Sequence, residues 1–116
     1  MSDCIFCKII EGEIPSEKVY EDEEIVAFED IDPRAPVHVL IVPREHIPTL
    51  NDTEPVQDGL LGRMVLVGMR IARENDVADS GYRLLINCNK DGGQEVFHLH
   101  LHMIGGRNLG PMVQKA

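Results

Sequence analysis

The stretch GGQEVFHLHLHMIGG, residues 92–106, carries three histidines that alternate with apolar residues. On a β-strand, His98, His100 and His102 would share one face, because successive strand side chains point to opposite faces. On a helix the same residues would spread around the axis and would not face a common point. The pattern therefore predicts a strand with three imidazoles in a row, about 6.6 Å apart at roughly 3.3 Å of rise per residue.

Two glycines, Gly92 and Gly93, precede this predicted strand and let main-chain amides approach an anionic ligand closely. A neutral imidazole such as that of His100 could attack a phosphorus centre and form a covalent phosphohistidine that water then resolves. That chemistry needs a partner that holds the tautomer of the nucleophile, and donors for the phosphate oxygens. The alternative is a catalytic zinc site, because H-x-H on a strand can supply imidazole ligands. On the residues alone, both interpretations stay open.

Length and charge limit the classes of function. A chain of 116 residues predicts one domain, residues 1–116, with a core of its own. The net charge of −9 argues against a nucleic-acid-binding surface, although local amides and histidines can still hold a small anion. No apolar run approaches the ~20 residues of a membrane span, and no signal-peptide pattern is present, so we expect a cytoplasmic protein without a membrane partner. Three cysteines, an odd number, fit a reducing compartment.

Periodicity and turn residues predict the other elements. We expect a short helix in residues 3–10, strands at 19–20, 25–28, 37–42 and 82–87, and one long helix from near Pro55 to about residue 75. Thr53, Asn51 or Asp52 is the expected cap of the long helix. This order predicts an α+β domain with an antiparallel sheet of about five strands and the histidines on a central strand.

Residues 98–104, HLHLHMI, resemble the signature of the histidine triad (HIT) family. The resemblance extends to IFCKII at 5–10, AFEDI at 27–31, PVHVLIVP at 36–43, and Asn87 ahead of Gly92-Gly93-Gln94. Nearly the full chain is similar to the Hint branch, the histidine triad nucleotide-binding proteins. The resemblance implies a homodimer with one continuous sheet. It also implies a purine nucleoside phosphoramidase that cleaves the P–N bond of AMP-type phosphoramidates and releases AMP and an amine.

The resemblance also implies a role for each histidine of the site. His100 would be the nucleophile and would carry the transient nucleotidyl group. His98 and His38 would form the hydrogen-bond relay that sets its tautomer, and His102 would contact the phosphate and the leaving group. A lone histidine in an apolar strand, as His38 is, is usually a core residue; the histidines downstream make a pairing with them the preferred interpretation.

The same resemblance implies where the nucleotide binds. Asp30 would bind the ribose hydroxyls, and the phosphate end would be held by Asn87 and the Gly93-Gln94-Glu95 segment. The apolar slot for the base would be lined by Ile31, Phe6 and Ile9, for which plain core packing is an equal alternative. Glu95 is a departure, because the animal members of this branch have a serine there. A carboxylate at this position repels phosphate and could attract a cationic amine.

Cys4 and Cys7 form half of a zinc motif. In some members that resemble this chain, such a pair binds structural zinc together with two histidines, which here would be His46 and His98. Four nitrogen and sulfur ligands suit tetrahedral zinc. The alternative is two packed thiols near the amino terminus, and Cys88 is predicted to be a core thiol in either case. No cofactor is expected to be required for the reaction itself.

Two other functions remain as alternatives to the phosphoramidase. One is a nucleotide-binding adaptor whose biological work is protein binding, and the other is a dinucleoside polyphosphate hydrolase. Intact histidines at 38, 98, 100 and 102 favour an enzyme over the adaptor. The expected partners are a purine nucleotide and a second copy of the chain.

Overall fold

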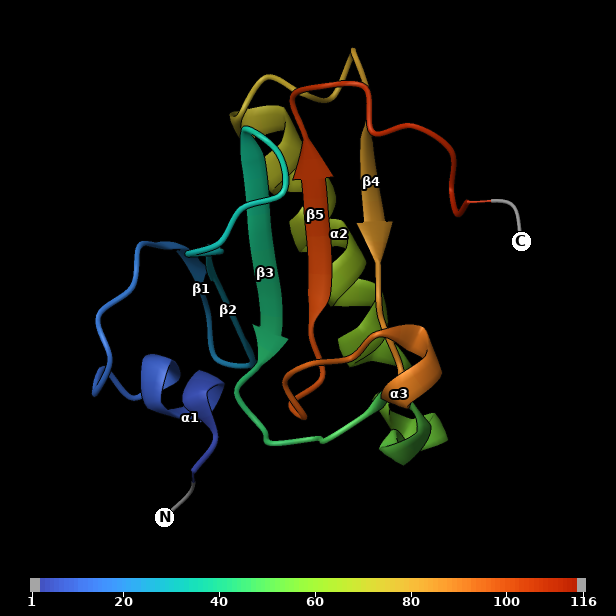
Figure 1. Ribbon diagram of the computed structural model, residues 1–116. Helices are drawn as coiled ribbons and strands as arrows, with labels where there is room; N and C mark the ends of the chain where they lie inside the picture. The colour runs from blue at the N-terminus through green and yellow to red at the C-terminus, as the bar shows by residue number, and fades with distance from the viewer. Residues whose placement is uncertain (1–2, 115–116) are drawn as a thin grey trace.

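An antiparallel sheet with the strand order β1-β2-β3-β5-β4 forms the centre of the computed structural model, which describes residues 3–114 (Figure 1). The strands are β1 (Lys18–Glu21), β2 (Ile25–Glu29), β3 (Val37–Pro43), β4 (Tyr82–Leu85) and β5 (Leu101–Gly105). The helices are α1 (Ile5–Ile10), α2 (Asp58–Glu74) and α3 (Asn89–Gly92), with single 3-10 turns at Leu50–Asp52 and Pro55–Gln57. Five antiparallel strands with helices confirm the predicted α+β class. The position of β5 between β3 and β4 confirms that the histidine segment leads into a central strand.

The long helix α2 covers one face of the sheet, behind β3, β5 and β4 in Figure 1. Its buried residues pack against the side chains of β3 and β5 that point to the same side, among them Ile41, Leu101 and Met103. A Cβ atom added at Gly68 would come within 3.0 Å of the Leu84 side chain, so this glycine lets the helix approach the sheet closely. None of the helices formed by residues 3–114 is long and apolar enough to cross a membrane.

On the other face of the sheet, α1 packs against β2 and β3 and forms a second, smaller core. Phe6 and Ile9 of α1 pack against Phe28 and Leu40, which alternate with the residues that face α2. His38 alternates in the same way on β3, and so does His102 on β5. The imidazoles of the sheet therefore lie on the side of α1, away from α2.

The histidine strand is shorter than the alternating pattern predicts. β5 begins at Leu101, so residues 97–100 are not part of the strand. The neighbouring strands end at this point: the last β3 pair is Ile41 with Leu101, and the last β4 pair is Leu85 with His102. Two residues further along β3 comes Pro43, which has no N–H to donate to a ladder. The prediction of one continuous strand through all three histidines is therefore wrong.

Two other predicted boundaries differ from the structure. β4 ends at Leu85, two residues before the predicted end of the strand. The predicted caps of the long helix are also wrong. Thr49 caps the preceding 3-10 turn together with Asp52. Gln57, which directly precedes α2, makes no side-chain hydrogen bond that caps this helix. Between β4 and the histidine segment, α3 forms a single helical turn.

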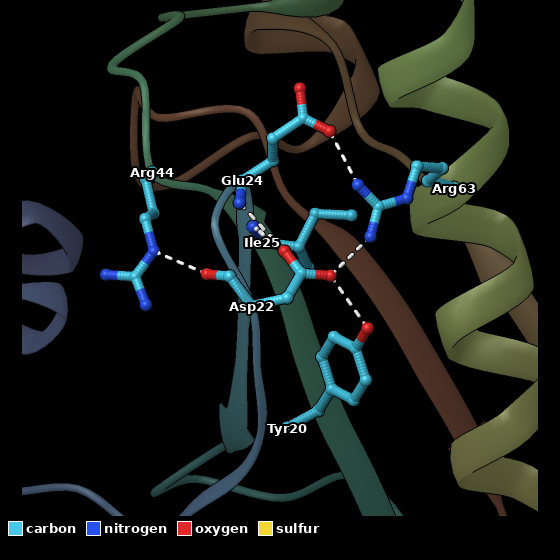
Figure 2. Close-up of polar contacts among 6 residues, drawn as sticks. All are labelled: Tyr20, Asp22, Glu24, Ile25, Arg44 and Arg63. Atoms are coloured by element: carbon cyan, nitrogen blue, oxygen red, sulfur yellow. Dashed lines mark hydrogen bonds and ion pairs between the residues drawn. The ribbon is translucent and has the colours of Figure 1, made fainter.

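Asp22 ties the β1–β2 turn to the helix layer (Figure 2). Its Oδ1 accepts hydrogen bonds from the main-chain N–H groups of Glu24 and Ile25, each at 2.8 Å. Its Oδ2 accepts the Tyr20 hydroxyl at 2.7 Å and also pairs with Arg63 of α2. Partial burial opposes ionisation, but these hydrogen bonds and the Arg63 charge outweigh it and lower the pKa of Asp22 to about 2.

We expect Asp22→Ala to lower the free energy of unfolding at pH 7 by about 1–3 kcal/mol, because it leaves the turn amides without an acceptor. The folded-state pKa of about 2 lies below the ordinary value of 3.8, so ionised Asp22 stabilises the fold above pH 3.8 and this contribution is lost as the pH falls through 2. Denaturant unfolding at pH 7 and pH 2 should therefore show a smaller difference between the variant and the wild type at pH 2.

Two variants serve as controls for this measurement. Asp22→Asn keeps an oxygen for the turn amides but loses the charge, so its stability should fall between the wild type and Asp22→Ala. Glu23→Ala removes an exposed neighbouring carboxylate and should change stability by less than about 0.5 kcal/mol. An equal loss in Asp22→Ala and Glu23→Ala would show that Asp22 has no anchoring role.

Candidate active site

A cavity of about 490 Å³ lies on the α1 side of the sheet. One wall is apolar and comes from α1 and β2, with Phe6, Ile9 and Phe28 among its residues. His38, His100 and His102 also line the cavity. Most of the predicted site residues line this cavity. They are Phe6, Ile9, Asp30, Ile31, His38, Asn87, Gly93, Glu95, His100 and His102. A cavity that combines an apolar lining with a few polar groups suits a flat ring joined to a polar tail.

The neutral form of His100 has its lone pair on Nε2. Its Nδ1 lies 2.7 Å from the main-chain oxygen of His98, and a carbonyl oxygen can only accept, so the hydrogen is on Nδ1. Burial lowers the pKa of His100, although the His98 carbonyl acts in the opposite direction. The ring of Phe6 packs edge-on against it with the ring centroids 5.0 Å apart. This arrangement produces a neutral imidazole whose Nε2 is available as a nucleophile.

His38 and His102 form a second pair whose tautomers follow from one main-chain donor. The N–H of Arg34 donates to His38 Nδ1 at 3.0 Å, which leaves the hydrogen of the neutral His38 ring on Nε2. That Nε2 lies 2.9 Å from His102 Nδ1, so His38 donates and the hydrogen of His102 is on Nε2. Burial, followed by the neighbouring rings of His100 and His38, lowers the pKa of His102 to about 4 and keeps the ring neutral.

His102 therefore brings an N–H donor next to the nucleophile. Its Nε2 is buried and has no hydrogen-bond partner within the described part of the chain. The His100 and His102 ring centroids are 4.9 Å apart, and both residues line the cavity. A buried donor without a partner is costly unless a ligand completes it. The site thus combines a lone pair on His100 with a donor on His102, which is what transfer of a phosphorus centre requires.

Residues 11–109 match the sequence pattern of the HIT domain. The chain belongs to the HIT domain family. It is 51% identical to an Escherichia coli K12 protein described as a purine nucleoside phosphoramidase, over 96% of this chain and 93% of that one. A HIT family hydrolase from Legionella pneumophila Philadelphia 1 has a similar structure, with a TM-score of 0.91 and 46% identity over 93% of this chain and 96% of that one. A histidine triad protein from Clostridium difficile gives a TM-score of 0.93 and 44% identity over 97% and 98%.

The relay in this HIT domain differs from the predicted one. His38 donates to His102, and the side chain of His98 donates from Nε2 to the main-chain oxygen of Pro43 at 2.8 Å. His98 contacts His100 as predicted, but through its main-chain carbonyl, whereas His38 contacts His102 and does not reach His100. Sequence reasoning also missed Arg34, because it acts on His38 through its main-chain N–H, which no side-chain pattern reveals.

The side chain of Gln94 stabilises the loop through hydrogen bonds to main-chain groups, so its predicted contact with phosphate is not supported. Its side-chain Nε2 donates to the main-chain oxygens of Pro48 at 2.8 Å and Val96 at 3.0 Å, and its Oε1 accepts the Asn89 N–H at 2.9 Å. The main-chain N–H groups of Gly93 and Gln94 are also occupied, by the oxygens of Lys90 and Asn89. Gly93, Asn87 and Glu95 line the cavity, but the Gly93 amide is not available as a donor.

The four predicted metal ligands come together on the other side of His98. The Nδ1 atom of His98 lies 3.3 Å from Cys4 Sγ, 3.6 Å from Cys7 Sγ and 3.2 Å from His46 Nδ1, and Cys7 Sγ lies 3.5 Å from His46 Nδ1. A tetrahedral zinc ion, with Zn–S of about 2.3 Å and Zn–N of about 2.0–2.1 Å, separates sulfur from nitrogen by about 3.6 Å and nitrogen from nitrogen by about 3.3 Å. The separations within the cluster match this spacing.

The tautomers show which of two clusters suits a metal. His98 donates from Nε2 to the Pro43 carbonyl, so its Nδ1 carries a lone pair toward the cysteines, an arrangement typical of metal-bound histidines. Asp30, His38 and His102 also place three ligand atoms within 4.8 Å of one another. There the Nε2 of His38 carries a hydrogen, because its Nδ1 accepts the Arg34 N–H. That second cluster fits a hydrogen-bond relay and does not fit a metal ion.

Proposed function

We propose that this HIT domain hydrolyses purine nucleoside 5′-phosphoramidates of the AMP-amine type by cleaving the P–N bond. The observation that carries the proposal is the tautomer of His100, whose Nδ1–H is held by the His98 carbonyl so that Nε2 is left with the lone pair. The 51% identity to a protein described as a purine nucleoside phosphoramidase supports the same substrate class. Membership in the family supports the coarser statement that the chain is a nucleotide hydrolase.

In the proposed reaction, His100 Nε2 attacks phosphorus and the P–N bond breaks. The nitrogen leaves with its bonding electrons and takes up a proton, which forms the free amine. The nucleotidyl-imidazolium on His100 is stabilised because its Nδ1–H still donates to the His98 carbonyl. Water then attacks the same phosphorus, His100 leaves, and AMP is released. The Nε2–H of His102 is placed to donate to a phosphate oxygen or to the departing nitrogen during these steps.

The apolar wall of the cavity supports a purine base at the α1 end. Phe6 and Ile9 are buried, and Ile31, with 89% of its surface exposed, stands at the rim where it can cover a ring. Asp30 lies on the same rim, beside the His38 pair, and is assigned to the ribose hydroxyls. Asn87 is assigned to the phosphate end.

We also propose that the chain works as a homodimer in the cytoplasm. The exposed edges of the sheet are β1 and β4, and an unpaired edge strand can continue a sheet into a second copy. Val65 and Leu66 lie exposed on α2, which adds an apolar surface for such a pairing. The odd number of cysteines supports a reducing compartment.

We further propose that Cys4, Cys7, His46 and His98 hold a structural zinc ion that takes no part in the chemistry. The spacing of the four ligand atoms and the tautomer of His98 support this assignment. The ion would join the amino terminus of α1, the loop after β3 and the segment that precedes β5. No cofactor is assigned to the reaction.

His100→Ala is expected to lower kcat on an adenosine 5′-phosphoramidate by at least about a thousandfold, because loss of a nucleophile typically costs 10³–10⁶. AMP binding by calorimetry and the oligomeric state by sedimentation should stay unchanged, and the exposed Lys90→Ala should keep full activity. Turnover that survives in His100→Ala would remove this residue as the nucleophile. A wild type that binds AMP without turnover would favour the adaptor, and faster cleavage of a diadenosine polyphosphate would favour that hydrolase class.

Glu95→Gln is expected to act on the leaving group. Glu95 is exposed on the cavity wall, so its attraction for a cationic amine amounts to about 0.2–1 kcal/mol. We expect kcat/KM for AMP joined to lysine to fall about two- to fivefold, while the value for AMP joined to an uncharged alkylamine stays constant. Asp91→Asn, an exposed change of the same charge outside the cavity lining, is the control. Equal slowing of both substrates by Glu95→Gln would contradict this role.

The zinc site predicts about one zinc ion per chain in protein purified without chelators. Cys7→Ser removes one of the four ligands and should lose most of the zinc, whereas Cys88→Ser should retain it, because Cys88 is not part of the cluster. Elemental analysis of the three proteins makes the comparison. Wild-type protein without zinc, or a Cys7→Ser variant with undiminished zinc, would contradict the assignment.

A further inference from the structure

The metal cluster and the catalytic cavity meet at a single residue, His98. The side chain of His98 contributes Nδ1 to the cluster, and its main-chain oxygen accepts the hydrogen bond from His100 Nδ1 at 2.7 Å. The other ligands come from different parts of the chain: Cys4 and Cys7 from the start of α1, and His46 from the loop after β3. Anything that moves His98 within the cluster also moves the carbonyl that determines the tautomer of His100.

The sheet does not hold this carbonyl in place. The last ladder pairs are Ile41 with Leu101 and Leu85 with His102, so residue 98 lies beyond both neighbouring strands. A main-chain hydrogen bond from Leu99 N–H to the oxygen of Ile47, at 2.6 Å, anchors the segment to the loop after β3. Gln94 Nε2 also donates to the oxygen of Val96, two residues earlier. Residue 98 itself is held by its own fully buried side chain, between the Pro43 oxygen on Nε2 and the cluster on Nδ1.

We propose that the ion held by Cys4, Cys7, His46 and His98 positions the nucleophile. By fixing the His98 ring, the ion fixes the main-chain carbonyl that keeps the hydrogen of His100 on Nδ1 and the lone pair on Nε2. Cys4, Cys7 and His46 are then positioning residues for the reaction, although none of them lines the cavity. This inference rests on the proposed zinc site and the proposed reaction, and it adds a link between the two.

Loss of the ion should change the rate of the chemical step and leave substrate binding nearly intact. Asp30 and Ile31, which are assigned to the ribose and the base, lie outside both the cluster and α1. In Ser-His-Asp enzymes, replacing the residue that holds the catalytic tautomer lowers kcat by about 10⁴. Here the carbonyl remains and only its placement loosens, so we expect a smaller loss, on the order of tenfold, with KM changed less than about twofold.

The test compares His46→Ala with His46→Cys. His46 is exposed, so both substitutions are compatible with the fold, and cysteine restores a fourth zinc ligand whereas alanine does not. Zinc content, kcat and KM on an adenosine phosphoramidate, and thermal unfolding are measured for each protein. In addition, ¹⁵N-histidine NMR of the substrate-free protein reports which nitrogen of His100 carries the hydrogen, with the His100 signals assigned by their loss in His100→Ala.

The proposal expects wild type and His46→Cys to hold zinc and to show His100 with its hydrogen on Nδ1 alone. His46→Ala should lose zinc, show both tautomers of His100, and lose about tenfold in kcat with KM little changed. If His46→Ala does not fold, the same comparison is made on wild-type protein stripped with a chelator and then reloaded with zinc.

Two results would overturn the proposal. One is a zinc-free His46→Ala protein in which the hydrogen of His100 stays on Nδ1 and kcat is unchanged. That result would be compatible with the zinc site and with the reaction, but it would show that the ion does not position the nucleophile. The other is wild-type protein that holds no zinc. Failure of the proposed reaction is a separate outcome, because the NMR comparison of His100 requires no substrate and still decides whether the ion sets the tautomer.

Discussion

The hydrogen bond from His100 Nδ1 to the main-chain oxygen of His98 is the interaction on which the chemistry of this HIT domain depends. A neutral imidazole has one donor and one acceptor nitrogen, and a carbonyl partner decides which is which. Because the partner is main chain, no side-chain substitution removes it directly, and only its position can change. The surrounding structure therefore acts on the nucleophile by placing one peptide group.

Main-chain hydrogen bonds also divide the other histidines into two sets with different roles. In the His38–His102 pair, the Arg34 N–H fixes the tautomer of His38, and His38 in turn fixes the tautomer of His102. The result is a buried N–H donor at His102 Nε2, beside the cavity. In the second set, the Pro43 carbonyl orients His98 so that its lone pair points toward the cysteines and His46. A main-chain donor at Arg34 therefore produces a hydrogen-bond relay, and a main-chain acceptor at Pro43 produces a metal site. Both sets nevertheless contain closely spaced histidines.

The position of the sheet edge explains why one segment can serve both sets. β5 is paired with β3 from Leu101 onward and with β4 from His102 onward, which makes His102 a rigid part of the sheet. His98 and His100 precede the ladder, where β3 turns away at Pro43 and the side chains replace the missing ladder bonds. A segment outside the ladder can curve so that one histidine faces the cavity while another faces the opposite cluster, which a regular strand of period two does not allow.

Local pattern determined much of this protein: the five strands and the long helix, the identity of the cavity histidines, and the pairing of Cys4 and Cys7 all follow from spacing along the chain. The late start of β5 at Leu101, the roles of Gln94 and His98, and the contribution of Arg34 did not follow from spacing. They depend on which main-chain groups meet side chains and strands from distant segments. Side-chain periodicity records which residues share a face. Tautomers and occupied amides are decided only when the tertiary fold brings carbonyls and N–H groups to particular nitrogens.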